Sequence, residues 1–162
     1  GALTRYFKEG NTITGIDIDD TALTEAARLG IETIKVDLNE EWTELSGRTF
    51  DAAVAGEVLE HLYFPERITG KVANLIKPGG FFVGSVPNAF SLKNRLRYLF
   101  GTKRHTPLSD PTHITQFHIK ELRSVLGKHF AQIEVRGLGR YAFLARLFPG
   151  LFAFDLFFIC RK

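Results

Sequence analysis

Sulfur is scarce in this sequence: its 162 residues include one cysteine and no methionine. The single cysteine, Cys160, excludes an internal disulfide, and no set of cysteines and histidines has the spacing of a zinc site. We therefore expect no metal and a reducing, cytoplasmic location. The sequence opens at Gly1 without an initiating methionine and with a helix-like run, so we expect the natural protein to be longer.

Long apolar runs are also missing. The most apolar stretch, residues 141–159, is interrupted by Arg146, by the pair Pro149-Gly150 and by Asp155. A membrane-spanning helix needs about 20 consecutive apolar residues. We therefore predict that this stretch is a buried crossover between two strands.

Acidic residues are absent between Glu66 and Asp110. Residues 1–66 contain 14 acidic and 5 basic residues, whereas residues 67–162 contain 4 acidic and 16 basic residues, which gives net charges of −9 and +12. The basic half would attract anions. Nucleic acid is not favoured as a partner, because the sequence lacks a recognised DNA- or RNA-binding module.

Hydrophobic periodicity predicts alternating helices and strands. This pattern is typical of a Rossmann-like, doubly wound α/β fold with a mostly parallel sheet, and the length fits one domain over residues 1–162. Strands are expected at 12–16, 32–36, 50–55, 81–86, 132–136 and 155–161, the third of them buried in the sheet centre and the last antiparallel. Helices are expected at 2–9, 20–29, 65–76 and 119–130.

Residues 89–116 interrupt this alternation as a basic insertion. A helix near residues 91–100 would place Leu92, Leu96 and Leu99 at helical spacing among lysines and arginines. Three uses fit this pattern: a lid whose apolar stripe packs on the sheet, a surface at residues 89–105 for an anionic membrane, or a clamp for an anionic substrate. A membrane-peripheral location is therefore one expectation.

Three neighbouring strands are each followed by an acid, namely Asp17, Asp37 and Glu57. Ligands of open parallel sheets bind beyond the carboxyl ends of the strands. Carboxylates there would accept hydrogen bonds from ribose hydroxyls, an amine or an ammonium group, but would not bind a pyrophosphate. Asp17 alone would also suit the ribose of a nicotinamide cofactor, so an oxidoreductase is an alternative. Turn and helix-cap roles are the structural alternatives for Asp17 and Asp37.

Several segments together resemble the class I S-adenosylmethionine-dependent methyltransferases, most closely the branch with ubiquinone-pathway O-methyltransferases and glycan methyltransferases. They are Gly15-Ile16-Asp17-Ile18-Asp19, Val36-Asp37-Leu38, Phe50-Asp51, Gly56-Glu57-Val58-Leu59-Glu60-His61-Leu62 and Lys77-Pro78-Gly79-Gly80. The strongest sign of this family is the Glu-Val-Leu-Glu-His run, followed about twenty residues later by Lys-Pro-Gly-Gly. Either segment alone would be weak evidence for the family, but the two together are specific.

The resemblance implies S-adenosylmethionine as the cofactor and a small-molecule or lipid-linked acceptor, methylated at oxygen. The implied cofactor contacts are Asp17 to the ribose and Ile18 to the adenine ring, Asp37 to the adenine amine and the Leu38 backbone to the ring edge, and Gly56 and Glu57 to the methionine part.

The first strand and the Asp-x-Gly-x-Gly-x-Gly loop of this family are missing. Gly1 resembles the last glycine of that loop and is a further expected cofactor contact. Because the missing strand would lie between those that lead to Asp17 and Glu57, we expect two unpaired strand edges. A chain that naturally starts at Gly1 would favour a non-catalytic binding remnant of the fold.

Two histidines are candidates for catalysis. His113 resembles a histidine that similar methyltransferases carry beside the acceptor, where it could remove a hydroxyl proton as a general base. Its alternative role is to cap the next helix. His61, next to Glu60, is the second candidate, with capping or packing as the alternative for both residues. His105 and His118 have weaker claims.

Overall fold

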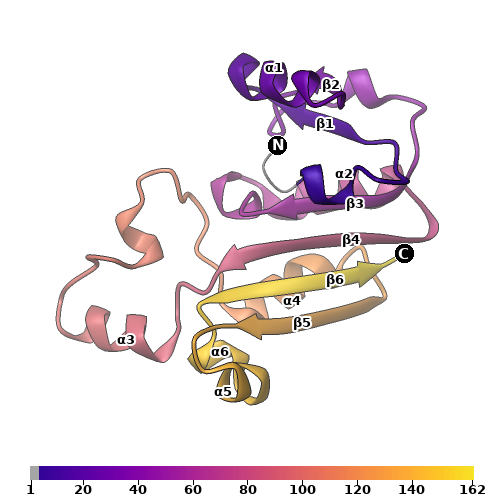
Figure 1. Ribbon diagram of the computed structural model, residues 1–162. Coiled ribbons are helices and arrows are strands. Elements are labelled where there is room, and N and C mark those ends of the chain that lie inside the picture. The colour runs from indigo at the N-terminus through magenta and orange to yellow at the C-terminus, as the bar shows by residue number, and fades with distance from the viewer. Residues whose placement is uncertain (1–3) are drawn as a thin grey trace. The chain divides into compact units, whose positions relative to one another are not determined.

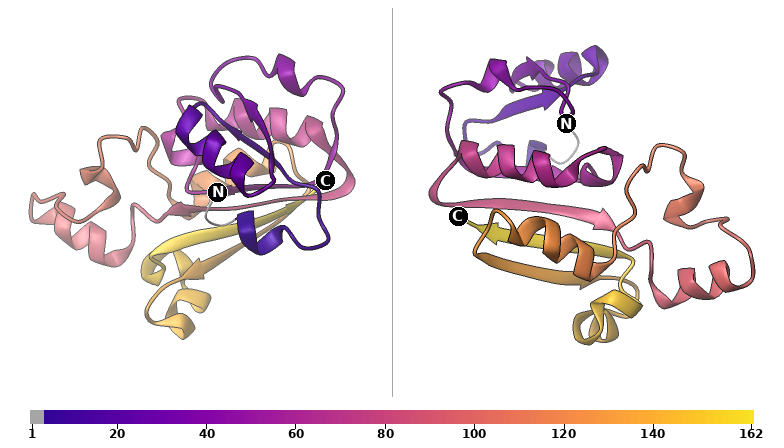
Figure 2. Two further views of the ribbon diagram at one scale, coloured as in Figure 1. Left: turned by 45° about the horizontal axis from the view of Figure 1, so that its top comes forward. Right: turned by 180° about the vertical axis from the view of Figure 1, so that it is seen from behind.

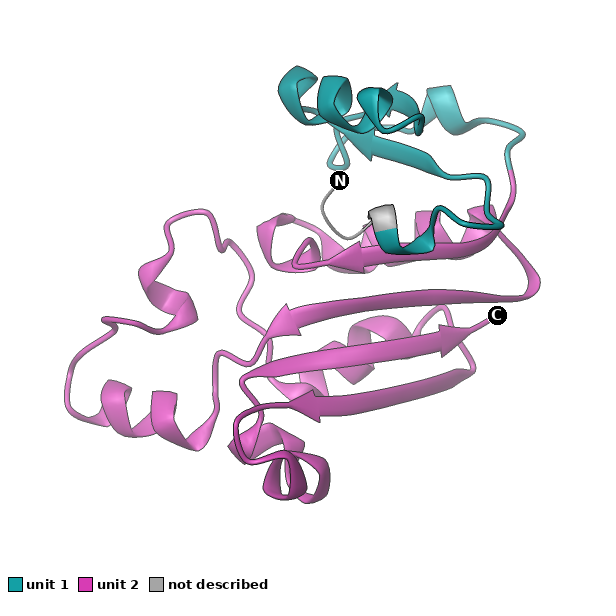
Figure 3. Cartoon of the chain, viewed as in Figure 1, with its two compact units in different colours: residues 1–48 teal, residues 49–162 magenta. Residues whose placement is uncertain are grey.

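The computed structural model describes residues 4–162, and the chain divides into two compact units, residues 1–48 and residues 49–162 (Figure 3). Each unit has its own sheet and its own buried residues. Gly1, which resembles a glycine of the cofactor loop, lies outside the described residues. The expectation of a single domain stays a prediction.

The first unit pairs two parallel strands beside one helix (Figure 1). Its elements are η1 (Thr4–Phe7), β1 (Thr14–Asp17), α1 (Asp20–Arg28), β2 (Glu32–Lys35) and η2 (Thr43–Leu45). The boundaries of α1 follow from its caps: the Asp19 side chain accepts from the N–H of Thr21 at 2.7 Å, and Gly30 has a φ of 73° just after the helix. The helix expected at 2–9 is, within the described residues, the short 3-10 turn η1.

The second unit contains a four-stranded sheet in the order β3-β4-β6-β5. Its strands are β3 (Phe50–Gly56), β4 (Ile76–Pro87), β5 (Gln132–Leu138) and β6 (Asp155–Arg161), and its helices are η3 (Leu59–His61), α2 (Pro65–Leu75), α3 (Leu92–Leu99), η4 (Pro107–Ser109), α4 (Ile119–Gly127), α5 (Ala142–Leu147) and α6 (Pro149–Phe152). β3 is parallel to β4, and β6 is antiparallel to both of its neighbours. The parallel pairs and the antiparallel last strand confirm the predicted fold class.

Helices α2 and α4 lie on the same face of this sheet (Figure 2, right). Side chains alternate between the two faces of a strand, and Phe82 and Val86 of β4 and Leu156 and Phe158 of β6 are all buried. These residues form the core of the second unit. No helix in residues 4–162 has the length and apolar character that crossing a membrane requires.

β3 lies at the edge of its sheet and not in the centre, so that prediction was wrong. Its other side has no partner strand among the described residues, and Val54 is 58% exposed. β1 likewise pairs only with β2. Both expected unpaired edges are therefore present.

β4 begins earlier than predicted, because residues 77–80 form part of the strand and not a turn. The N–H of Gly79 donates to the carbonyl of Lys162 at 3.1 Å, and the N–H of Lys162 donates to the carbonyl of Gly80 at the same distance. Lys162 thus continues the β4–β6 pairing beyond β6. It does so beside Lys77-Pro78-Gly79-Gly80, which the sequence predicted to be a turn.

The segment before β6 is not a buried crossover, which corrects a second prediction. It forms the short helices α5 and α6, in which Ala145 is fully buried but Phe143 is 73% exposed. The small residue Gly137 on β5 permits the close approach, since a Cβ there would lie 2.4 Å from the Ala145 carbonyl oxygen. Helix α5 therefore packs through the small residue Ala145 and leaves Phe143 outside.

Candidate functional site

Asp17 and Asp37 lie at the same edge of the first unit. Asp17 ends β1, and its carbonyl accepts from the N–H of Val36 at 3.0 Å, directly before Asp37. Local turns orient both carboxylates: the Oδ1 of Asp17 accepts from the N–H of Asp19 at 3.0 Å, and that of Asp37 from the N–H of Asn39 at 2.9 Å. The sequence predicted this shared strand-end position.

An apolar residue follows each of these acids. Ile18 is 56% exposed beside Asp17 and so presents apolar surface next to this carboxylate. Leu38 is half-buried, and its carbonyl accepts from the Trp42 indole Nε1–H at 3.2 Å, which fixes the loop after β2. The edge thus combines hydrogen-bond acceptors with apolar surface, the chemistry that a nucleoside requires.

Glu57 follows Gly56 at the carboxyl end of β3 and has a φ of 56°, a strained value for a residue with a side chain. Two bonds to β4 hold it: its N–H donates to the Ser85 carbonyl, and its Oε1 accepts from the Ser85 hydroxyl, both at 3.0 Å. Strain that the surrounding structure enforces is common at functional sites.

Asp155 lies at this same edge, and the sequence reasoning missed it as a site residue. Because β6 is antiparallel to β4, its first residue, Asp155, pairs with Pro87 at the end of β4. Burial raises the pKa of Asp155 to about 6, and the charge of Glu57 contributes in the same direction. The predicted antiparallel last strand could have identified this residue, since its first position falls at the carboxyl end of β4.

Glu60 is the second residue of η3, three positions after Glu57, and is 2% exposed. Neither of its carboxylate oxygens has a hydrogen-bond partner on another residue of the described chain. Burial raises the pKa of Glu60 to about 7, and the nearby charge of Glu57 adds to this effect. An unpartnered buried carboxyl group is costly, so its position requires an explanation.

The structure brings His61 and His113 together, with ring centroids 4.9 Å apart in an edge-to-face arrangement. The Nδ1 of His61 is 3.0 Å from the carbonyl of Thr112, a residue 51 positions later, and the Nδ1 of His113 is 3.2 Å from the carbonyl of Pro107. The N–H of Thr115 donates to the Glu60 carbonyl at 2.9 Å. These bonds fasten the loop that carries His113 onto η3.

The remaining histidines have other positions. His118 caps α4, since its Nδ1 accepts from the N–H of Lys120 at 3.3 Å and Glu121 bonds back to the His118 N–H. His105 is exposed and has a φ of 58°. The helix-cap role considered for His113 therefore belongs to His118.

Comparisons with known proteins identify the family of this chain. Residues 1–129 match the methyltransferase domain family. A ubiquinone biosynthesis O-methyltransferase from Photobacterium profundum is 34% identical over 97 residues, which cover 57% of this chain and 40% of that protein. One from Burkholderia ambifaria is 28% identical over 151 residues, covering 75% and 63%. The chain thus spans about half the length of these curated relatives.

Solved structures agree on the fold. The N-methyltransferase NodS from Bradyrhizobium japonicum, solved with S-adenosyl-L-homocysteine, superposes with a TM-score of 0.64 at 17% identity, covering 100% of this chain and 72% of that one. At this identity the likeness shows the fold alone. Taken with the family match, it shows that the chain belongs to the methyltransferase domain family and has the class I methyltransferase fold.

Proposed function

We propose that the protein transfers a methyl group from S-adenosylmethionine to a hydroxyl of a small-molecule or lipid-linked acceptor. The observation that supports this most is the shared position of Asp17 and Asp37 at the carboxyl ends of two parallel strands, with the exposed Ile18 beside them. Oxygen is favoured as the methylated atom because the relatives above carry the name O-methyltransferase.

The first unit would hold the adenosine part of the cofactor. Asp17 would accept from the ribose hydroxyls and Ile18 would cover the adenine ring. Asp37 would accept from the adenine amine, while the Leu38 backbone would bind the ring edge. A nicotinamide cofactor is less well matched, because its pyrophosphate would meet this acidic edge.

The contacts expected for the methionine part of the cofactor lie at the carboxyl end of β3. Glu57, with Gly56, would bind the ammonium group, and Asp155 adds negative charge next to it. The bound cofactor supplies a methyl group that its sulfonium already activates, so the protein has mainly to align the acceptor and exclude water. His61 and His113 would contact the acceptor.

Calorimetric titration of the full-length protein with S-adenosylhomocysteine tests this function. We expect Asp17→Asn and Asp37→Asn each to weaken binding by about 10-fold or more, because each removes a charge-assisted hydrogen bond. Glu25→Gln, which removes the same charge from α1, should leave binding unchanged. Tight binding of NADH together with no binding of S-adenosylhomocysteine would refute the proposal.

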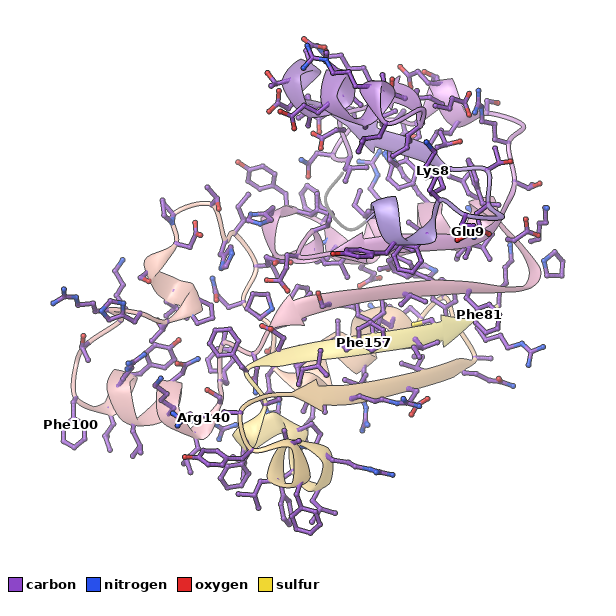
Figure 4. The ribbon with its side chains drawn as sticks, viewed as in Figure 1. Lys8, Glu9, Phe81, Phe100, Arg140 and Phe157 are labelled. Carbon is purple, nitrogen blue, oxygen red and sulfur yellow. The ribbon has the colours of Figure 1, made fainter. Side chains whose placement is uncertain are left out.

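We also propose that α3 contacts an anionic membrane surface, which would suit a lipid-linked acceptor. One of the three uses considered was a lid whose apolar stripe packs on the sheet, and that packing is not observed: Leu99 is 77% and Phe100 80% exposed, and Phe100 points away from the chain (Figure 4). The helix is attached instead through its polar face, where Tyr98 donates to the Ala89 carbonyl at 2.9 Å. Exposed apolar side chains among basic residues are typical of interfacial helices.

A further inference from the structure

Helices α5 and α6, which lie together beside the end of β5, carry the densest group of exposed apolar side chains in the second unit (Figure 1). Six large side chains on these helices and next to them are each more than half exposed. They are Leu138, Tyr141, Phe143, Leu147, Phe148 and Phe154. We call these six residues the α5–α6 surface. Soluble proteins rarely expose apolar patches of this size except where another molecule binds.

The six side chains belong to neighbouring stretches of backbone. Phe143 and Leu147 are four residues apart on α5, so they lie on the same side of that helix. Phe148 directly follows α5 and is also the N-cap residue of α6. The N–H of Phe154 donates to the carbonyl of Leu138 at 2.7 Å, which brings the two ends of the segment side by side. The surface is therefore continuous.

The helices that carry this surface are firmly attached to the sheet. Asn88, at the end of β4, is fully buried, and its side-chain amide donates to the carbonyls of Pro149, Gly150 and Ala153 at 3.1–3.3 Å. A surface held in this way needs little ordering when a partner binds, and this lowers the entropic cost of association.

The charged residues of this segment are all arginines. Between Glu134 and Asp155 the chain has no acid and no lysine, and Arg140 and Arg146 are exposed next to the apolar side chains. Aromatic residues and arginine are enriched in protein–protein interfaces, whereas lysine, aspartate and glutamate are depleted. An anionic lipid surface attracts lysine as well, and residues 89–105 contain both types. The composition of the α5–α6 surface therefore favours a protein partner.

We infer that the α5–α6 surface joins two copies of this chain in a symmetric dimer. In a two-fold interface, a residue that contacts a second residue of the partner is contacted by that same residue in return. A surface with both aromatic rings and arginines is then complementary to itself, because each guanidinium group can lie over a ring of the other copy. This inference goes beyond the proposed function and does not depend on it.

The size of the surface agrees with a dimer. A large side chain presents about 200 Å² when fully exposed, so the six residues together present roughly 700 Å². Each partner of a standard interface buries about 800 Å². The apolar side chains alone thus supply most of the area that a stable dimer requires.

Sedimentation equilibrium of the full-length protein tests the inference. We expect the mass of two chains, with dissociation on dilution. The double variant Phe143→Glu, Leu147→Glu should raise the dissociation constant at least about 30-fold, because it would bury carboxylates against apolar side chains. Arg146→Gln should raise it about 2–5-fold through loss of a cation over a ring. Phe64→Glu makes the same change at an exposed aromatic residue outside the surface and should dimerise like the wild type.

Hydrogen exchange of the wild type provides a second measurement that does not depend on any variant folding. Amides of α5 and α6 should exchange more slowly at high protein concentration than at low concentration, and those of α2 should not change. A wild type that is monomeric at all concentrations, or a double variant that dimerises as tightly as the wild type, would overturn the inference. So would a monomeric wild type that floats with anionic vesicles only while Phe143 and Leu147 are intact, because the surface would then bind lipid.

Discussion

Gly84 lies in β4 at a point where the sheet leaves no room for a side chain. A Cβ at this position would lie 2.1 Å from the Ala55 carbonyl oxygen and 2.5 Å from the Cζ of Phe158. We predict that Gly84→Ala lowers the free energy of unfolding by about 2–3 kcal/mol, because β3 or the buried Phe158 ring must move. Urea denaturation monitored by circular dichroism measures this change.

Gly127, at the end of α4, provides the matched control. A Cβ there would have its nearest neighbour, the Cδ1 of Ile133, at 3.5 Å, which is ordinary contact. Gly127→Ala should therefore be neutral or stabilising by up to about 1 kcal/mol through helix propensity. Equal urea midpoints for the two alanine variants would show that β4 adapts to a side chain at position 84.

The sequence predicted part of the candidate site, through the type of residue that follows each strand. Asp17 and Asp37 were identifiable because each directly follows a strand, and strand direction then places both at one edge. The conformation of Glu57 and the isolation of Glu60 could not be predicted, since a positive φ and an unpartnered carboxylate depend on the surrounding structure. Sequence spacing cannot predict that the loop before α4 folds back onto η3.

At the scale of elements, α3 is the part of the second unit best suited to a membrane surface. We predict that the wild type floats with anionic vesicles and that the double variant Leu99→Glu, Phe100→Glu does not, because it replaces the most exposed apolar residues of this helix with charges. Vesicle flotation with and without phosphatidylserine measures the effect. Binding of the wild type to anionic vesicles should weaken as the salt concentration rises.

The control for this experiment is Lys120→Glu on α4, which changes the net charge by the same amount outside the basic insertion. This variant should float with the vesicles almost as well as the wild type. Two results would exclude α3 as a specific membrane contact. One is a wild type that does not float with anionic vesicles, and the other is a Lys120→Glu variant that floats as poorly as the double variant.

Local signals decided which elements were predictable. α1 ends where its cap residues indicated, and β6 has the predicted bounds because its apolar residues are continuous. The aromatic stretch before β6 misled the prediction, since apolar composition does not show whether a short helix is packed through its large or its small residues. In α5 the small residue Ala145 is the buried one.

At the scale of the whole molecule, the two units have very different cores. Of the buried hydrophobic residues in the described chain, 5 belong to the first unit and 18 to the second. Within residues 4–48 the first unit forms a two-stranded sheet, a structure that is marginally stable by itself. Sequence periodicity identified the strands of both sheets but not this division, because which strands pair depends on tertiary contacts.

This difference predicts unequal hydrogen exchange. Amides of β1 and β2 should exchange faster than those of β4 and β6, because few buried apolar contacts oppose local opening of the first unit. S-adenosylhomocysteine should slow exchange around Asp17 and Asp37 if it binds there, since a ligand of the folded state suppresses opening. Mass spectrometry of peptides from both sheets measures the rates with and without ligand. Equal protection of the two sheets in the free protein would mean that they open as one cooperative unit, and protection confined to the second unit on adding ligand would place the adenosine away from β1 and β2.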